Sequence, residues 1–174
     1  MDNLRLISLN HIFDNCYRLN EVSIANNNIV YLDEYMFKNC IYLSKVEIPF
    51  NHVEYIPQNL FMNSWNLTTV NFSNNKIQKL PNNLFFHCPN LKQLNFEHNQ
   101  LIDIPDNLLH SKTKLTSLNI YKNKLLKLPE QLLDACSTLQ HLYADIPIIY
   151  NIIDCVDNLD KLQIQTYYTE FNIR

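Results

Sequence analysis

The side chains of this chain that could do chemistry are its six histidines and five cysteines, and their spacing limits what that chemistry would be. None of the histidines lies in an H-x3-H, HExxH or C-x2-C…H pattern, whereas a zinc site requires three or four converging ligands. The nearest approach to such a site, or to a thiol beside a base, is His87 with Cys88 and the more distant His110. The chain has no glycine, which excludes a glycine-rich phosphate loop and a G-x-S-x-G elbow. We therefore expect no catalytic residue, no metal site and no cofactor.

Four of the cysteines are spaced by multiples of 24 residues: Cys16, Cys40, Cys88 and Cys136. Ser64 and Lys112 fill the corresponding places in the other copies of this spacing. A ladder of redox or metal sites would need cysteines of neighbouring copies close enough to form a disulfide or share a metal ion, and only Cys16 and Cys40 fall in adjacent copies. We interpret these thiols as packing groups, which is consistent with a reducing compartment.

A 24-residue repeat positions these side chains, and each of its blocks begins on a leucine: Leu19, Leu43, Leu67, Leu91 and Leu115. The fourth and sixth residues of each block are apolar and alternate with polar residues, which predicts a short strand with one buried face. Further along, a proline precedes a buried apolar pair, as in Pro57 with Leu60 and Phe61. Proline suits the first position of a short helical or 3-10 turn, so we expect such a turn opposite the strand.

The ninth residue of every block is an asparagine, at the point where the strand turns away. With its leucines and proline, the block resembles the leucine-rich-repeat family, whose consensus is L-x-x-L-x-L-x-x-N-x-L-x-x-L-P-x-x-L-F, and its period fits that architecture. The recurring F-x-x-C-x-x-L is similar to variant repeats of the family. The resemblance implies an α/β solenoid, a curved right-handed coil with a parallel sheet on the concave face and short helical or 3-10 turns on the convex face. It also implies a structural asparagine ladder that bonds neighbouring coils: Asn27, Asn51, Asn75, Asn99 and Asn123.

The repeat divides the chain into parts of one domain, residues 1–174. Residues 1–18 form a partial N-terminal coil or cap, 19–138 five repeats, and 139–174 degenerate coils and a C-terminal cap. The initiating Met favours a complete short protein, and a piece of a longer array is the alternative. The last block shortens to 20 residues before Leu159.

Because the chain has no glycine, we assign turns with positive φ to asparagines: Asn26 to Asn28, Asn74, Asn75, Asn82 and Asn83.

Composition and charge exclude several classes of function. The net charge is −3 and the outward strand positions carry no basic stripe, which argues against a nucleic-acid partner. No stretch approaches 18 consecutive apolar residues and the N-terminus lacks the pattern of a signal peptide, so we expect no membrane partner and a cytoplasmic location. The residue usage indicates AT-rich coding. We interpret the sequons at Asn66 and Asn71 as chance matches.

The family resemblance implies that the concave strand face binds partners, so the outward residues are the candidates for function. Large aromatic side chains are enriched among binding hot spots. The candidate protein-binding residues are Phe50, Asn71, Asn95, Glu97, His98, Asn119, Tyr121 and Tyr143. The sequence thus predicts a non-enzymatic scaffold for an unidentified protein or peptide. The alternatives are self-association through an exposed terminal coil and the substrate-recognition subunit of an assembly such as a ubiquitin ligase.

Overall fold

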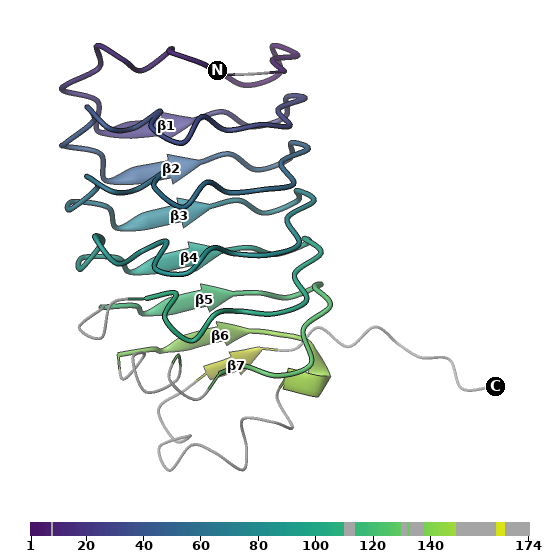
Figure 1. Ribbon diagram of the computed structural model, residues 1–174. Coiled ribbons are helices and arrows are strands. Elements are labelled where there is room, and N and C mark those ends of the chain that lie inside the picture. Colours follow the sequence, from purple (N-terminus) through teal and green to yellow (C-terminus); the bar gives the residue numbers. More distant parts are fainter. Residues whose placement is uncertain (8, 110–113, 130–131, 133–137, 149–162, 166–174) are drawn as a thin grey trace.

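The computed structural model is a solenoid of stacked coils with a seven-stranded parallel sheet along one side (Figure 1). The structure describes residues 1–7, 9–109, 114–129, 132, 138–148 and 163–165. The strands lie in chain order and each pairs in parallel with the next. This confirms the predicted solenoid with its parallel sheet. The strands are β1 (Glu21–Ser23), β2 (Lys45–Glu47), β3 (Thr69–Asn71), β4 (Gln93–Asn95), β5 (Ser117–Asn119), β6 (His141–Tyr143) and β7 (Gln163–Gln165).

The register of the sheet follows the repeat. Val22 pairs with Val46 and Val46 with Val70, so equivalent positions of successive blocks stack directly on one another. The last block departs from the prediction, because Ile164 pairs with Leu142 and the step is therefore 22 residues (164 − 142) rather than 20. Leu159, from which the shorter block was inferred, lies outside the described residues.

A single apolar core runs the length of the stack between the sheet and the opposite turns. Its largest side chains form a column in which the rings of Phe13, Phe37, Phe61 and Phe85 follow one another at centroid distances of 5.4, 6.1 and 5.5 Å. Such a column buries a large apolar area in every coil, which a lone coil could not do. The aromatic residues that we expect to cover the C-terminal end of the core lie outside the described part of the chain.

The cysteines of the repeat belong to this core. Cys40 and Cys88 are buried, and their thiols lie 3.9 and 4.0 Å from the carbonyl oxygens of Phe13 and Phe61 in the preceding coil. Burial, with a smaller contribution from Cys16, raises the pKa of the Cys40 thiol to about 11. Burial raises the pKa of the Cys88 thiol to about 12. Both are packing thiols, as predicted.

The asparagine ladder forms as the family resemblance implies. The Oδ1 atom of Asn75 accepts a hydrogen bond from the Val53 N–H at 3.0 Å, and its Nδ2 donates to the Ile48 carbonyl at 2.9 Å. Both partners belong to the preceding coil, and Asn75 is only 8% exposed. Each such amide satisfies backbone groups that would otherwise be buried without partners. The equivalent bonds from Oδ1 and Nδ2 recur at Asn27, Asn51, Asn99 and Asn123.

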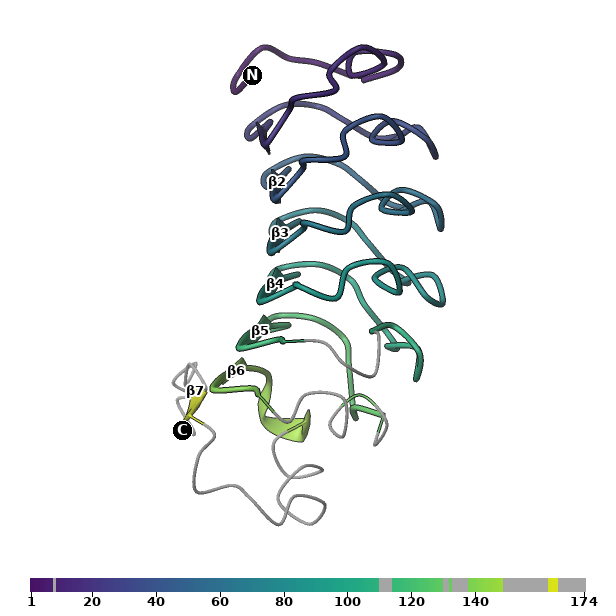
Figure 2. The same cartoon turned by 90° about the vertical axis from the view of Figure 1, so that its left-hand side faces the viewer.

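The convex side, opposite the sheet in Figure 2, consists mainly of single hydrogen-bonded turns with little helix. The Leu60 N–H donates to the Pro57 carbonyl and the Ser64 N–H to the Phe61 carbonyl, both three residues back. Further asparagines, for which the sequence predicted no structural role, donate from Nδ2 to carbonyl groups of the preceding coil at 2.7 to 3.0 Å: Asn39, Asn63, Asn66 and Asn90.

The turn that ends each strand requires a left-handed backbone at the eighth position of the block. Asn26 and Asn74 adopt it as predicted, with φ of 55° and 57°, as does Asn83 on the convex side. The other predicted asparagines (Asn27, Asn28, Asn75 and Asn82) do not. Three residues of other types adopt it at the eighth position, with φ of 53° to 56°, namely Phe50, His98 and Lys122, and Arg5 and His11 adopt it in the N-terminal coil.

Candidate functional site

The outward side of the sheet is the surface that the sequence singled out. Strands β1 to β6 bury the central side chain and leave the flanking two at least partly exposed, as in β2, β3 and β5, whereas the central Ile164 of β7 is only half-buried. Figure 2 shows that these strands line the inner side of a gentle curve. The outward side chains of adjacent strands therefore form columns about 4.8 Å apart from one strand to the next.

The central column consists of Asn71, Asn95 and Asn119, which pair directly in the register of β3, β4 and β5. The Oδ1 atom of each accepts the N–H two residues further on, at 2.9, 2.9 and 3.1 Å. This local bond fixes the orientation of each amide. In the described part of the chain, the Nδ2 groups of Asn71 and Asn95 have no acceptor, so they are available as donors at the surface. The Nδ2 of Asn119 donates to the Glu97 carboxylate at 3.1 Å.

This column lies in a shallow hollow of about 300 Å³ on the outer side of the sheet. Four predicted residues meet there, namely Asn71, Asn95, Asn119 and the half-buried Tyr143, which stands opposite Asn119 in β6. The hollow also contains residues that the sequence placed outward without selecting them, and the only signal for them was their register. They are Glu47, Thr69, Gln93 and Ser117; the buried central residues Val70 and Leu94, which the sequence placed inward, also line the hollow.

The remaining predicted residues lie outside the hollow. Tyr121 was expected to offer exposed contact area, but it is only 6% exposed. Ser73 at the same seventh position is 5% exposed, whereas Glu97 at that position is half-buried, so the position alone does not determine how deeply a side chain packs. Lys122 also lies over the Tyr121 ring, with Nζ 5.4 Å from the centroid. Phe50 and His98 are exposed, but they sit one position further on, beyond the ends of the strands.

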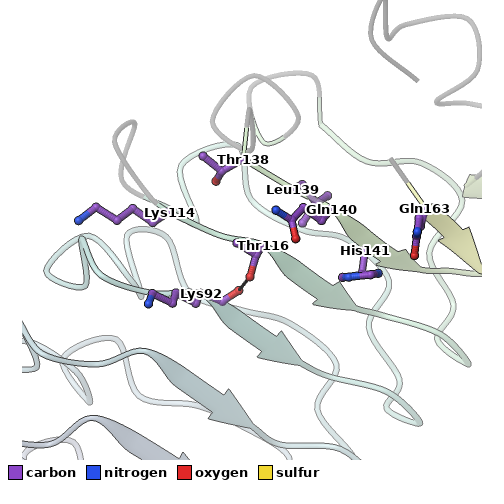
Figure 3. Close-up of a pocket in the computed structure, with 8 residues that line it drawn as sticks. All are labelled: Lys92, Lys114, Thr116, Thr138, Leu139, Gln140, His141 and Gln163. Atoms are coloured by element: carbon purple, nitrogen blue, oxygen red, sulfur yellow. Dashed lines mark hydrogen bonds between the residues drawn. The ribbon is translucent and has the colours of Figure 1, made fainter. Parts of the chain in front are cut away.

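A second hollow of about 740 Å³ lies at the starts of strands β4 to β7 (Figure 3). The sequence did not predict it, because its residues come from the end of one block and the start of the next. Lys92 immediately precedes β4, Lys114 belongs to the segment before β5, and His141 begins β6. The other lining residues are polar except for Leu139: Thr116, Thr138, Gln140 and Gln163.

The histidine and cysteine pair at the convex turn has the surroundings of a packing cluster. The His87 ring lies edge-on to Trp65 and Phe86 at centroid distances of 5.0 and 5.2 Å. The raised pKa of Cys88 keeps its sulfur protonated near neutral pH, whereas a nucleophile requires the thiolate. His110 is outside the described residues. Among those described, no three His, Cys, Asp or Glu residues are grouped closely enough to hold a metal ion.

Comparison with known proteins identifies the repeat. The family model "BspA type Leucine rich repeat region" matches residues 8–142 in six copies. A search of curated proteins found no match. None of the helices in the described ranges has the length and apolar character needed to cross a membrane.

Several solved structures share the fold. In the Drosophila Toll–Spatzle complex, one chain aligns with 95% of this chain over 22% of its own length, at 22% identity and a TM-score of 0.77. A leucine-rich-repeat protein of Leptospira interrogans aligns with 86% of this chain over 37% of its own length, at 24% identity and a TM-score of 0.75. A chain of the LRIM1/APL1C complex aligns with 79% of this chain over 27% of its length, at 25% identity and a TM-score of 0.70. This chain therefore spans less than half the length of each.

Proposed function

Because the chain belongs to the BspA-type leucine-rich-repeat family, we propose that it is a non-enzymatic scaffold that binds another polypeptide across the outer side of its sheet. The observation that carries the proposal is the fixed row of amides in β3, β4 and β5. Two of these amides, at Asn71 and Asn95, line the hollow and have N–H donors that no acceptor among the described residues uses. Donors held in place before binding lose little conformational entropy when they meet the carbonyl groups of a polypeptide.

The surroundings of the row suit the same role. Tyr143 adds a half-buried aromatic side chain at one side of the hollow, a type that recurs at the centres of protein interfaces. Among the similar structures, the Toll chain and the LRIM1/APL1C chain are each described in a complex of proteins. The free thiols of Cys16, Cys40 and Cys88 support a cytoplasmic location, which we propose as well, because unpaired thiols persist in reducing compartments.

The test uses random 12-residue peptides displayed on phage and selected on the immobilised protein. The tightest selected peptide is labelled, and its affinity is measured by fluorescence anisotropy for the wild type, Gln93→Trp and Gln78→Trp. Gln93 lies in the hollow, whereas Gln78 is an exposed glutamine that follows β3 and lies outside the hollow. The two variants therefore receive the same change inside and outside the proposed site. We expect Gln93→Trp to weaken binding by about tenfold or more and Gln78→Trp to leave it unchanged. Equal affinity for both variants would reject the site, provided that circular dichroism shows both to be folded.

Self-association is the second candidate function. Leu4 and Ile7 in the N-terminal coil are 61% and 67% exposed, although they are apolar. A second copy would cover them. Sedimentation velocity of the wild type and Leu4→Ser/Ile7→Ser over a hundredfold range of concentration separates the two ideas. Self-association through this coil requires a dimer in the wild type that the double variant loses.

A further inference from the structure

We propose that the hollow at the starts of β4 to β7 binds an acidic segment, with two or more carboxylates, of the polypeptide that occupies the sheet. This inference rests on the proposed function and names the chemistry of the partner. The hollow adjoins the row of amides, because Lys92 and Thr116 directly precede Gln93 and Ser117 of the first hollow. One extended chain can therefore contact both.

Within the described part of the chain, the two lysines of the hollow have no ion-pair partner. The ion pairs of the described residues are Met1 with Asp2, His11 with Asp14 and Lys45 with Glu47, and none of them involves Lys92 or Lys114. The Lys114 Nζ lies 3.4 Å from the Asn90 Oδ1, which holds the ammonium group without neutralising it. Figure 3 shows the two lysine side chains extending in the same direction from neighbouring coils. They form a pair of cations with no carboxylate among the described residues that line the hollow.

In the part of the chain that the structure describes, the lysines and the side-chain amides supply the free hydrogen-bond donors of the hollow. The Thr116 hydroxyl donates to the Lys92 carbonyl at 3.1 Å, and the Thr138 hydroxyl donates to the Leu115 carbonyl at 2.7 Å, so both hydroxyl protons are already used. The N–H groups that remain belong to the two lysines and to the side-chain amides of Gln140 and Gln163. The buried Nδ1 of His141 has no hydrogen-bond partner in the structure, and such an atom is costly until a ligand or water supplies one.

Among the described residues, the carboxylates on this side of the sheet lie away from the hollow: Glu21 in β1, Glu47 at the end of β2, and Glu97 and Asp145 after β4 and β6. Glu47 pairs with Lys45 at 3.0 Å, and the Glu97 carboxylate accepts from Asn119. The Asp145 carboxylate accepts the N–H groups of residues 122 and 123 at 3.3 and 3.1 Å. Over the described ranges, the charge at the starts of β4 to β7 is therefore positive, and the carboxylates lie elsewhere on the sheet. An acidic segment complements this charge, and a basic segment would be repelled.

Nuclear magnetic resonance of the ¹⁵N-labelled chain tests the proposal. Three 12-residue peptides are titrated to millimolar concentration: one with Glu at alternate positions between Ser residues, its twin with Gln at those positions, and its twin with Lys. We expect the Glu peptide alone to shift the amide signals around Lys92, Thr116, Gln140 and His141, and the shifts to weaken with added NaCl. Shifts of equal size with the Gln peptide, or no shifts at these residues with the Glu peptide, would overturn the proposal.

Charge variants supply the second readout. Lys92→Gln/Lys114→Gln removes the two cations, and Lys76→Gln/Lys79→Gln makes the same change of net charge at exposed lysines outside the hollow. We expect the first pair to weaken binding of the Glu peptide by about threefold to thirtyfold and the second pair to leave it unchanged. Equal affinities of the two double variants for the Glu peptide would overturn the proposal. Free glutarate that reproduces the shifts at the same carboxylate concentration would also overturn it, because the site would then hold only a small anion.

The two proposals fail separately. In one outcome, a display-selected peptide loses affinity for Gln93→Trp but binds Lys92→Gln/Lys114→Gln as tightly as the wild type. This result supports the sheet as the binding surface and rejects the acidic segment. In the other outcome, the Glu peptide binds at the lysines, but Gln93→Trp does not change the affinity of any selected peptide. This result rejects the sheet as the binding surface and leaves an isolated site that binds anions.

Discussion

Ser64 is the residue whose replacement should most clearly stabilise the fold. It occupies the repeat position that is cysteine at Cys40 and Cys88, it is fully buried, and its hydroxyl has no hydrogen-bond partner. A buried hydroxyl without a partner costs about 1 to 3 kcal/mol. In Ser64→Cys the larger sulfur fills a site of the shape that its neighbours occupy. By analogy with Cys40 and Cys88, whose thiols lie 3.9 and 4.0 Å from a carbonyl 27 residues back, its acceptor would be the Phe37 carbonyl.

We expect Ser64→Cys to raise the free energy of unfolding by about 1 to 2 kcal/mol, because the thiol costs much less to bury than a hydroxyl. Each kcal/mol corresponds to about 2 to 4 °C in Tm for a chain of this size. The measurement is urea unfolding followed by circular dichroism, with a reducing agent present throughout. Ser64→Ala is the control, since it removes the hydroxyl without filling the space and should lie between the wild type and Ser64→Cys.

The outcome that would refute this reasoning is a loss of stability in both variants. Loss in both would mean that the Ser64 hydroxyl contributes a bond that outweighs its burial. Loss in Ser64→Cys alone would mean that the third coil is narrower than the second and fourth, so that packing rather than hydrogen bonding decides the residue at this position.

Two further predictions concern the backbone and the thiols. Phe50→Asn should stabilise the fold by about 1 kcal/mol and Asn74→Phe should destabilise it by a similar amount, because both positions have a left-handed backbone that asparagine tolerates better. Urea unfolding measures the free energy of unfolding of both variants. Equal changes in the same direction would contradict the prediction. Burial raises the pKa of Cys88 from 9.0 to about 12, so above pH 9 the thiol ionises only in the unfolded chain, and stability should fall by roughly 1.4 kcal/mol per pH unit up to about pH 12. Below pH 9 the thiol should contribute no pH dependence, and Cys88→Ala should show a shallower alkaline loss than the wild type; parallel curves would refute the assignment.

The register of the stack could be predicted from the sequence because each inward position is repeated in the next block. Val22, Val46 and Val70 can be buried together only if the blocks align without a shift, and a slip of one residue would expose all of them. The asparagine recurs at the ninth position of every block, and the resemblance to the family implied that it bonds the neighbouring coil. Repetition thus determined the core and the hydrogen bonds between coils.

The conformation at the eighth position could not be read from the residues that occupy it. Phe50 and His98 do not favour a left-handed backbone, yet the N–H of each donates to a carbonyl of the next coil, Ser73 and Tyr121 respectively, at 3.1 and 3.0 Å. The stacking therefore imposes the turn, whatever the side chain. Alternation along the strand placed Tyr121 outward, but its side chain is buried beside this turn.

The candidate site divides into residues that the fold needs and residues that it does not. Asn71, Asn95 and Asn119 form the row of donors, but each also closes its own turn through Oδ1, so replacing them would change the backbone as well as the surface. The neighbouring outward positions hold Thr69, Gln93 and Ser117, whose side chains make no hydrogen bond within the described part of the chain. These three can change without disturbing a coil. Specificity for a partner should therefore depend on them, while the asparagines supply a constant set of donors for its main chain.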